Sequence, residues 1–310
     1  MSAARAGWDP RNIPSQHGRV YLVTGANAGL GFFSSEQLAR AGAHVIMSGR
    51  NPNRLAAARA ALMRRLPGAS VESLLLDTSN LGSVRAASAT VGARQRLDGV
   101  LLNAGIVHPP AERTLTRDGV EIVFATNVLG HFALAGSLLP ALRRASGGRM
   151  VWLGSMSTSM WRYVPEDPQL EQGYTPWRAY VQSKVATQAL GLEADRRLRA
   201  ADVPVTSVIA HPGYSVGGRT AGIPGVNTPS RLKRFGANLQ APITQSKAHG
   251  AWAPVRALTD PAAAGGSAWG PAWIMKGMPR PARVAPVSRD AARAAELWSF
   301  CEQTAGVRWP

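Results

Sequence analysis

The chain has little cysteine, no long apolar run and no metal-binding pattern. Its 310 residues include a single cysteine, Cys301, so no disulfide can form within the chain. No Cys/His cluster has zinc-site spacing, and we therefore expect a cytoplasmic, reducing environment. No stretch approaches about 18 uninterrupted apolar residues, so we expect no membrane span. Residues 1–17 lack the apolar segment of a secretory signal, and we interpret them as a polar lead-in.

Acidic residues are also scarce. The 18 Asp and Glu residues face 35 Lys and Arg residues, which gives a formal net charge of +17. Such a charge is found in proteins that bind nucleic acids or anionic membranes. The arginines are scattered through the expected helices, however, so biased composition is the alternative explanation. No recognised nucleic-acid motif accompanies the charge, and we expect no nucleic-acid partner.

Short apolar segments alternate with helical segments through residue 210. The expected strands are 19–24, 43–48, 71–76, 99–102, 149–153 and 203–210. Apolar strands with little alternation, separated by helices, are typical of a parallel sheet that is covered on both faces. The pattern predicts a three-layer α/β/α Rossmann fold with a doubly wound parallel sheet, as one domain over residues 18–310.

Two long connections break this rhythm, at residues 156–179 and 213–247. Connections of this length in a compact domain are usually lids or binding loops. After them we expect a helix at 247–258, a last strand within 265–273 and a final helix at 289–304. A long helix is expected earlier, at 119–144.

The segment TGANAGLG, residues 24–31, lies between the first expected strand and the first helix. Gly25 permits a tight turn, Gly29 lets the backbone approach a pyrophosphate, and Gly31 allows close packing. The N–H groups at a helix N-terminus favour bound phosphate. An ordinary glycine turn is the alternative, but the strand–turn–helix context predicts a dinucleotide site. The expected contacts are Gly25, Asn27, Gly29, Leu30 and Gly31.

Residues that follow the second, third and fourth expected strands indicate which dinucleotide binds and where it lies. Where NAD-binding domains place an acid after the second strand, this chain has Gly49 followed by Arg50. Arg50 can bond a 2′-phosphate, so we expect NADP(H), with NAD(H) the less favoured cofactor. Asp77 is a candidate to bond the adenine, or else it begins a turn. Small residues after the fourth strand would let a cofactor lie flat on the backbone: Asn103, Ala104 and Gly105.

Tyr180 and Lys184 are four residues apart at the expected start of a helix over 180–200, so they share one helix face. An ammonium beside a phenol favours the phenolate, and so does the positive nicotinamide of an oxidised cofactor. Lowering the phenol pKa by ~3 units requires about 4 kcal/mol, which we expect these two charges to supply together. Tyr180 could then exchange a proton with a carbonyl or alcohol oxygen. A solvated surface pair is the alternative.

Two further polar residues could join this pair. Ser155 directly follows the fifth strand, at the sheet edge where ligands bind, and could hold the substrate oxygen. It could equally be a turn serine. Asn127 lies inside a long expected helix, an indifferent place for asparagine. It could bond a water that relays protons to Lys184, or be an exposed helical residue.

In this order, the motifs resemble the short-chain dehydrogenase/reductase family. The matching segments are TGANAGLG at 24–31, Asp77, LNAG at 102–105, Asn127, Ser155, YVQSK at 180–184 and HPG at 211–213. The resemblance implies a tetrad of Asn127, Ser155, Tyr180 and Lys184, with Pro212 and Gly213 beside the nicotinamide. The spacing between Ser155 and Tyr180 is similar to that of the bacterial retinol dehydrogenase and protochlorophyllide reductase-like subgroup. Departures occur at Phe33, Ser35, Leu102 and Gly154.

The resemblance implies hydride transfer between NADP(H) and a small-molecule carbonyl or alcohol, in a homodimer or homotetramer. An apolar substrate is suggested by aromatic and aliphatic residues of the two long connections, although these could simply pack onto the core: Trp161, Tyr163, Trp177, Ile223 and Leu232. A non-catalytic NADP(H) sensor or scaffold on the same fold is the alternative function. The physiological substrate, the reaction direction and the stereochemistry stay open.

Overall fold

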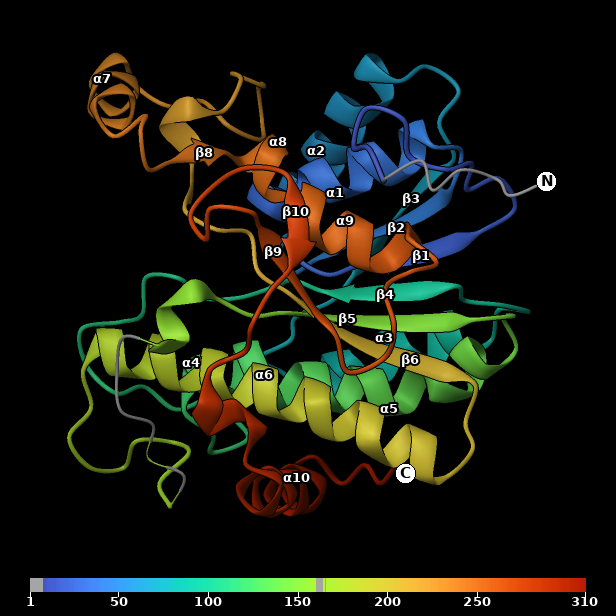
Figure 1. Ribbon diagram of the computed structural model, residues 1–310, viewed down its shortest axis with the longest axis vertical. Coiled ribbons are helices and arrows are strands. Elements are labelled where there is room, and N and C mark those ends of the chain that lie inside the picture. Colours follow the sequence, from blue (N-terminus) through green and yellow to red (C-terminus); the bar gives the residue numbers. More distant parts are fainter. Residues whose placement is uncertain (1–7, 160–163, 165) are drawn as a thin grey trace.

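The computed structural model describes residues 8–159, 164 and 166–310, and these form layers around one central sheet (Figure 1). The strand order is β10-β9-β6-β5-β4-β1-β2-β3, and all pairs except β10–β9 are parallel. The strands are β1 (Val20–Val23), β2 (His44–Gly49), β3 (Val71–Leu75), β4 (Gly99–Leu102), β5 (Gly148–Leu153), β6 (Val205–Ala210), β9 (Ala268–Pro271) and β10 (Pro279–Pro281). The strand order reverses between β1 and β4, so the expected doubly wound fold is confirmed.

Helices cover both faces of this sheet (Figure 1). One face carries α1 (Gly29–Arg40), α2 (Pro52–Arg65), α8 (Lys247–Gly250) and α9 (Trp252–Thr259). The other carries α3 (Leu81–Gly92), α4 (Ile122–Phe124), α5 (Gly130–Arg143) and α6 (Pro176–Ala200), with α10 (Ala291–Ala305) outside α5 and α6. In the middle of the sheet, β4 is apolar on both sides because both sides face helices, and all four of its residues are buried.

The long helix expected over 119–144 is divided by a π-helical turn. The π turn spans Ala125–Leu129 between α4 and α5, and Asn127 lies within it. Such turns occur frequently at functional sites. Among the described residues, one continuous helical stretch, Ile122–Arg143, has the length and apolar composition of a membrane span, which the sequence analysis did not single out. Within the domain, 89% of the most apolar part of this stretch is buried.

The helix that carries Tyr180 begins earlier than expected. It starts at Pro176, because the Thr175 hydroxyl caps the N–H of Arg178 and proline suits the first helical turn. Tyr180 therefore lies in the second turn of the helix rather than at its start.

The edge strand β10, which pairs with β9, was not expected from the sequence. Prolines in a segment argue against a strand. As an antiparallel edge strand it tolerates Pro279 and Pro281.

The connection 213–247 contains regular structure that the sequence analysis did not predict. A small parallel pair, β7 (Ser215–Val216) and β8 (Gln245–Ser246), closes its base. Between them lies α7 (Arg231–Leu239), which is capped by the Ser230 side chain and projects from the body of the domain (Figure 1). In the connection 156–179, a 3-10 turn spans Met156–Ser159; part of this connection lies outside the described residues.

Candidate active site

The glycine turn after β1 forms one wall of a cleft at the carboxyl edge of the sheet. Gly25 has φ +65°, and a Cβ there would lie 2.9 Å from Ala104 Cα. A Cβ on Gly31 would overlap the carbonyl oxygen of Gly25, so Gly31 allows α1 to begin against the turn. The structure places Gly25, Asn27, Gly29 and Leu30 in the cleft wall, while Gly31 is buried behind it.

Thr24 ties the glycine turn to the end of β4. Its hydroxyl oxygen accepts hydrogen bonds from the backbone N–H groups of Asn103 and Ala104, both at 2.8 Å. The Asn103 side chain returns a bond to the Thr24 carbonyl at 2.6 Å. These contacts hold Asn103, Ala104 and Gly105 in the cleft wall beside the glycine turn, after β4 as the sequence analysis expected.

Arg50 and Asp77 also line the cleft, at the ends of β2 and β3. Asp77 accepts bonds from the N–H and hydroxyl of Ser79, at 3.0 and 2.7 Å, so it begins a turn as well as facing the cleft. Two further cations, Arg54 and Lys247, share this wall and were missed by the sequence analysis. Glycine N–H groups with three cations are a suitable donor set for a phosphate-bearing dinucleotide.

The expected reacting residues meet at the other end of the same cleft. The Tyr180 hydroxyl donates to Ser155 Oγ at 3.3 Å, and Ser157 also donates to that oxygen, from its hydroxyl at 2.9 Å. Lys184 donates from Nζ to the Leu153 carbonyl at 2.7 Å. Tyr180 and Lys184 both line the cleft. The helix α6 thus brings the pair to the end of β5, beside Ser155.

Burial shifts the pKa values of both Tyr180 and Lys184. Burial raises the pKa of Tyr180 above its usual value, while the hydrogen bond with Ser155 acts in the opposite direction. Burial also lowers the pKa of Lys184 to about 8. Removing either group from water disfavours its charged form. The expected lowering of the phenol pKa is therefore not produced by these side chains alone.

Asn127 is buried, which excludes an exposed helical position. Its side-chain oxygen accepts from the N–H of Ile106 at 2.8 Å, and its Nδ2 donates to the Ser183 hydroxyl at 2.9 Å. Asn127 therefore joins the loop after β4 to α6, and its contact on α6 is Ser183, the residue before Lys184. This is a positioning role, and the water relay to Lys184 stays a prediction.

His131 is a positioning residue that the sequence analysis missed. It lies one helical turn after Asn127, and its ring contacts Thr24 Oγ1 at 3.0 Å and the Asn127 carbonyl at 3.2 Å. Burial, together with the charge of Lys184, lowers the pKa of His131 to about 3, so the ring is neutral. It connects the glycine turn to the π turn. Its four-residue spacing from Asn127 is the sequence signal that could have found it.

The loop after β6 contributes Pro212 to the cleft wall. Gly213 has φ +61° and packs against the Met275 carbonyl, where a Cβ would overlap that oxygen. The Pro212 carbonyl accepts from Ser215 and Gln245, both at 2.8 Å, which fixes the loop to β7 and β8. The structure therefore brings Pro212 to the cleft, and assigns Gly213 to packing beneath it.

The apolar residues of the two connections have different positions. Trp177 is half-exposed, with its ring centroid 6.0 Å from that of Tyr180. Ile223 is buried in the core, so it packs within the domain instead of facing the cleft. Leu232 is exposed on α7. Trp161 and Tyr163 lie outside the described residues.

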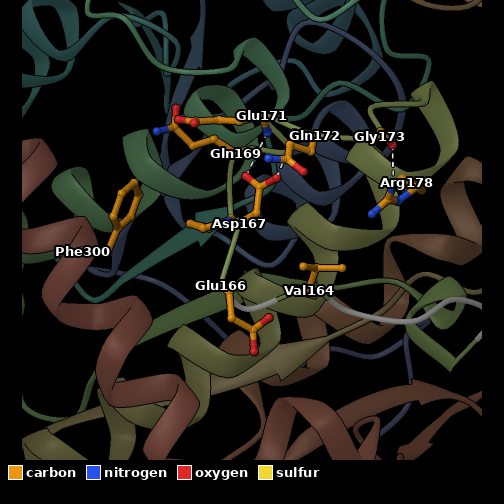
Figure 2. A pocket seen from close by; sticks show the side chains of 10 residues that line it. Val164, Glu166, Asp167, Gln169, Glu171, Gln172, Gly173, Arg178 and Phe300 are labelled. Atoms are coloured by element: carbon orange, nitrogen blue, oxygen red, sulfur yellow. Dashed lines mark hydrogen bonds between the residues drawn. The ribbon is translucent and has the colours of Figure 1, made fainter.

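A second hollow of about 760 Å³ lies on the 156–179 connection (Figure 2). The carboxylate of Asp167 accepts bonds from the backbone N–H groups of Glu171 and Gln172, at 2.8 and 3.0 Å. These contacts shape a turn, and none of the expected tetrad lines the hollow. We therefore assign the chemistry to the cleft at the sheet edge.

Comparison with known proteins agrees with this arrangement. The family model described as short chain dehydrogenase matches residues 19–216, more than half of the chain. The chain belongs to the short-chain dehydrogenase family. The family that the motifs resembled and the fold that they implied are thus confirmed, and the family is one of oxidoreductases.

This short-chain dehydrogenase has relatives in mammals and bacteria. It is 36% identical over 214 residues to polyprenol dehydrogenase of Mus musculus, covering 67% of this chain and 63% of that protein. It is 36% identical over 230 residues to retinol dehydrogenase 14 of Mus musculus, covering 68% of each. A crystal structure of an uncharacterized protein from Mycobacterium Paratuberculosis covers 98% of this chain and 99% of its own, with 33% identity and a TM-score of 0.79. These relatives support the retinol dehydrogenase-like subgroup.

Proposed function

We propose that this chain is an NADP(H)-dependent oxidoreductase of the cytoplasm that acts on the carbonyl or alcohol group of an apolar small molecule. The observation that carries the proposal is a cleft lined by the glycine turn, Tyr180 and Lys184, in which the Tyr180 hydroxyl is hydrogen-bonded to Ser155. A sensor or scaffold would need the glycine turn but not a partly buried tyrosine bonded to a serine, four residues before a buried lysine.

In this proposal Tyr180 is the acid/base. A substrate oxygen that accepts bonds from the Ser155 and Tyr180 hydroxyls is aligned for proton exchange with Tyr180. Bound nicotinamide supplies or accepts the hydride. The buried Lys184 ammonium, fixed by the Leu153 carbonyl, favours the phenolate form when Tyr180 gives up its proton. Its pKa of about 8 means that it is mainly charged at neutral pH.

The preference for NADP(H) rests on Arg50, Arg54 and Lys247 in the cleft wall. Arg50 follows β2 directly, at the place where an acid would bond the ribose of NAD. Lys247 begins α8, and its Cδ lies 4.0 Å from the position of a Cβ on Gly29. We assign Arg50 to the 2′-phosphate and Lys247 to the pyrophosphate beside the glycine turn.

An apolar substrate is supported by Trp177 beside Tyr180 and by relatives named for polyprenol and retinol. The test is a panel of carbonyls and alcohols graded from short and polar to long and apolar, followed at the NADPH absorbance. We expect turnover to rise with apolar length. Reduction of short polar carbonyls alone would contradict the substrate class. Tight NADPH binding without turnover of any member would favour the sensor.

A further inference from the structure

The helix α7 has an apolar face directed away from the domain. Leu232 and Phe235 are 78% and 63% exposed, and Leu239 is also exposed. At about 100° per residue these three side chains lie on one side of the helix. Contacts with the body come from the opposite side, where Arg234 donates to the Thr220 carbonyl at 3.3 Å. The apolar face therefore has no partner within the described chain.

A second exposed apolar element lies beside α7. The turn between β9 and β10 carries Trp273, which is 80% exposed, and Ile274, which is also exposed. Ile274 has φ +59°, a conformation that a β-branched residue rarely adopts. Lys276, in the same turn, donates from Nζ to the Ala241 carbonyl at 3.2 Å, just after α7. Helix and turn thus belong to one surface, which we name the α7 surface.

The segment of the chain that carries this surface is rich in positive charge. Between residues 203 and 289 the chain has ten Lys and Arg residues and one acidic residue, Asp260, which is paired with Arg256. Arg231 and Lys233 are exposed on α7 itself. A second copy of the chain would bring the same cations against this surface, and like charges would oppose its docking. An apolar helix face with flanking cations instead complements an anionic lipid surface.

We propose that the α7 surface docks on membranes that contain anionic lipids. Leu232, Phe235 and Leu239 would enter the boundary between headgroups and acyl chains, with Trp273 at the headgroup level. Arg231 and Lys233 would contact lipid phosphates. The surface is hydrogen-bonded to the cleft loop, since Tyr214 N–H donates to the Met275 carbonyl at 2.7 Å. The proposal does not depend on the reaction that the cleft performs.

Sedimentation of the full chain with lipid vesicles tests this docking. We expect binding to vesicles of equal parts phosphatidylcholine and phosphatidylglycerol, weak binding to phosphatidylcholine alone, and loss of binding at high salt. Phe235→Ser should weaken binding about tenfold or more, because one buried aromatic contact is lost. Lys233→Glu should weaken it by roughly fivefold or more.

Matched controls separate the α7 surface from general stickiness. Leu75→Ser removes an apolar side chain that is 57% exposed at the far edge of the sheet, and Arg85→Glu reverses an exposed charge on α3. Both should bind vesicles like the original chain. No binding to anionic vesicles would overturn the proposal. An equal loss of vesicle binding in the two control variants would also overturn it. So would a dimer in light scattering that Phe235→Ser dissociates, because the apolar face of α7 would then bind a second copy of the chain.

Discussion

The Tyr180→Phe variant tests the proposed chemistry most directly, because it keeps the ring and removes the hydroxyl. That hydroxyl donates to Ser155 at 3.3 Å, longer than the usual O–H···O range of about 2.5–3.0 Å. Its loss should therefore cost at most about 1 kcal/mol of stability. Loss of a general acid/base should lower turnover by about 10²–10⁴, which corresponds to ~3–5 kcal/mol in the barrier. The catalytic effect therefore exceeds the structural one.

The assay measures turnover of an apolar carbonyl and, separately, NADPH affinity by fluorescence. We expect the Tyr180→Phe variant to bind NADPH like the original protein and to melt within a few degrees of it. Tyr174→Phe is the matched control, because the Tyr174 hydroxyl donates to the Pro110 carbonyl at 3.0 Å and lies outside the cleft wall. Its turnover should be unchanged. Retention of turnover within tenfold in Tyr180→Phe would refute the assignment of Tyr180 as acid/base.

Three further predictions concern the cofactor and the buried framework. Arg50→Ala should weaken NADPH binding by about tenfold to a hundredfold and leave NADH binding unchanged, with Arg64→Ala as control; an equal effect on both cofactors would contradict the assigned contact. Gly31→Ala should abolish cofactor binding and destabilise the fold by about 1–3 kcal/mol, because its Cβ overlaps the Gly25 carbonyl, whereas Gly92→Ala meets no atom within 4 Å and should be tolerated. Burial lowers the pKa of His131 from 6.5 to about 3, so the unfolded chain binds a proton more readily than the folded one. The free energy of unfolding should therefore be highest above pH 6.5 and should fall by up to about 5 kcal/mol as the pH decreases toward 3. Urea unfolding at several pH values should show that His131→Gln weakens this dependence, that the buried His211, with its pKa lowered to about 4, still contributes to it, and that exposed His108→Gln retains it in full.

Much of the fold could be read from the sequence because its signals are local. Most strands of the central sheet are short apolar runs bounded by turns, and β4 has the bounds that were expected. The signals failed where local preference and tertiary context disagree. Prolines hid β10, whose edge position tolerates them. Asn127 gave no sign of the π turn, which depends on how α4 and α5 pack on their neighbours.

By itself, the sequence determined the glycine turn and the shared face of Tyr180 and Lys184, since backbone freedom at glycine and the repeat of a helix are local properties. Only the tertiary structure brought Ser155 to Tyr180 and Lys247 to the glycine turn, because sheet topology joins segments that are distant along the chain. It also set the pKa of Lys184 near 8, since that value follows from burial by several elements at once. The outward face of α7 was decided in the same way, by which side of the helix the domain covers.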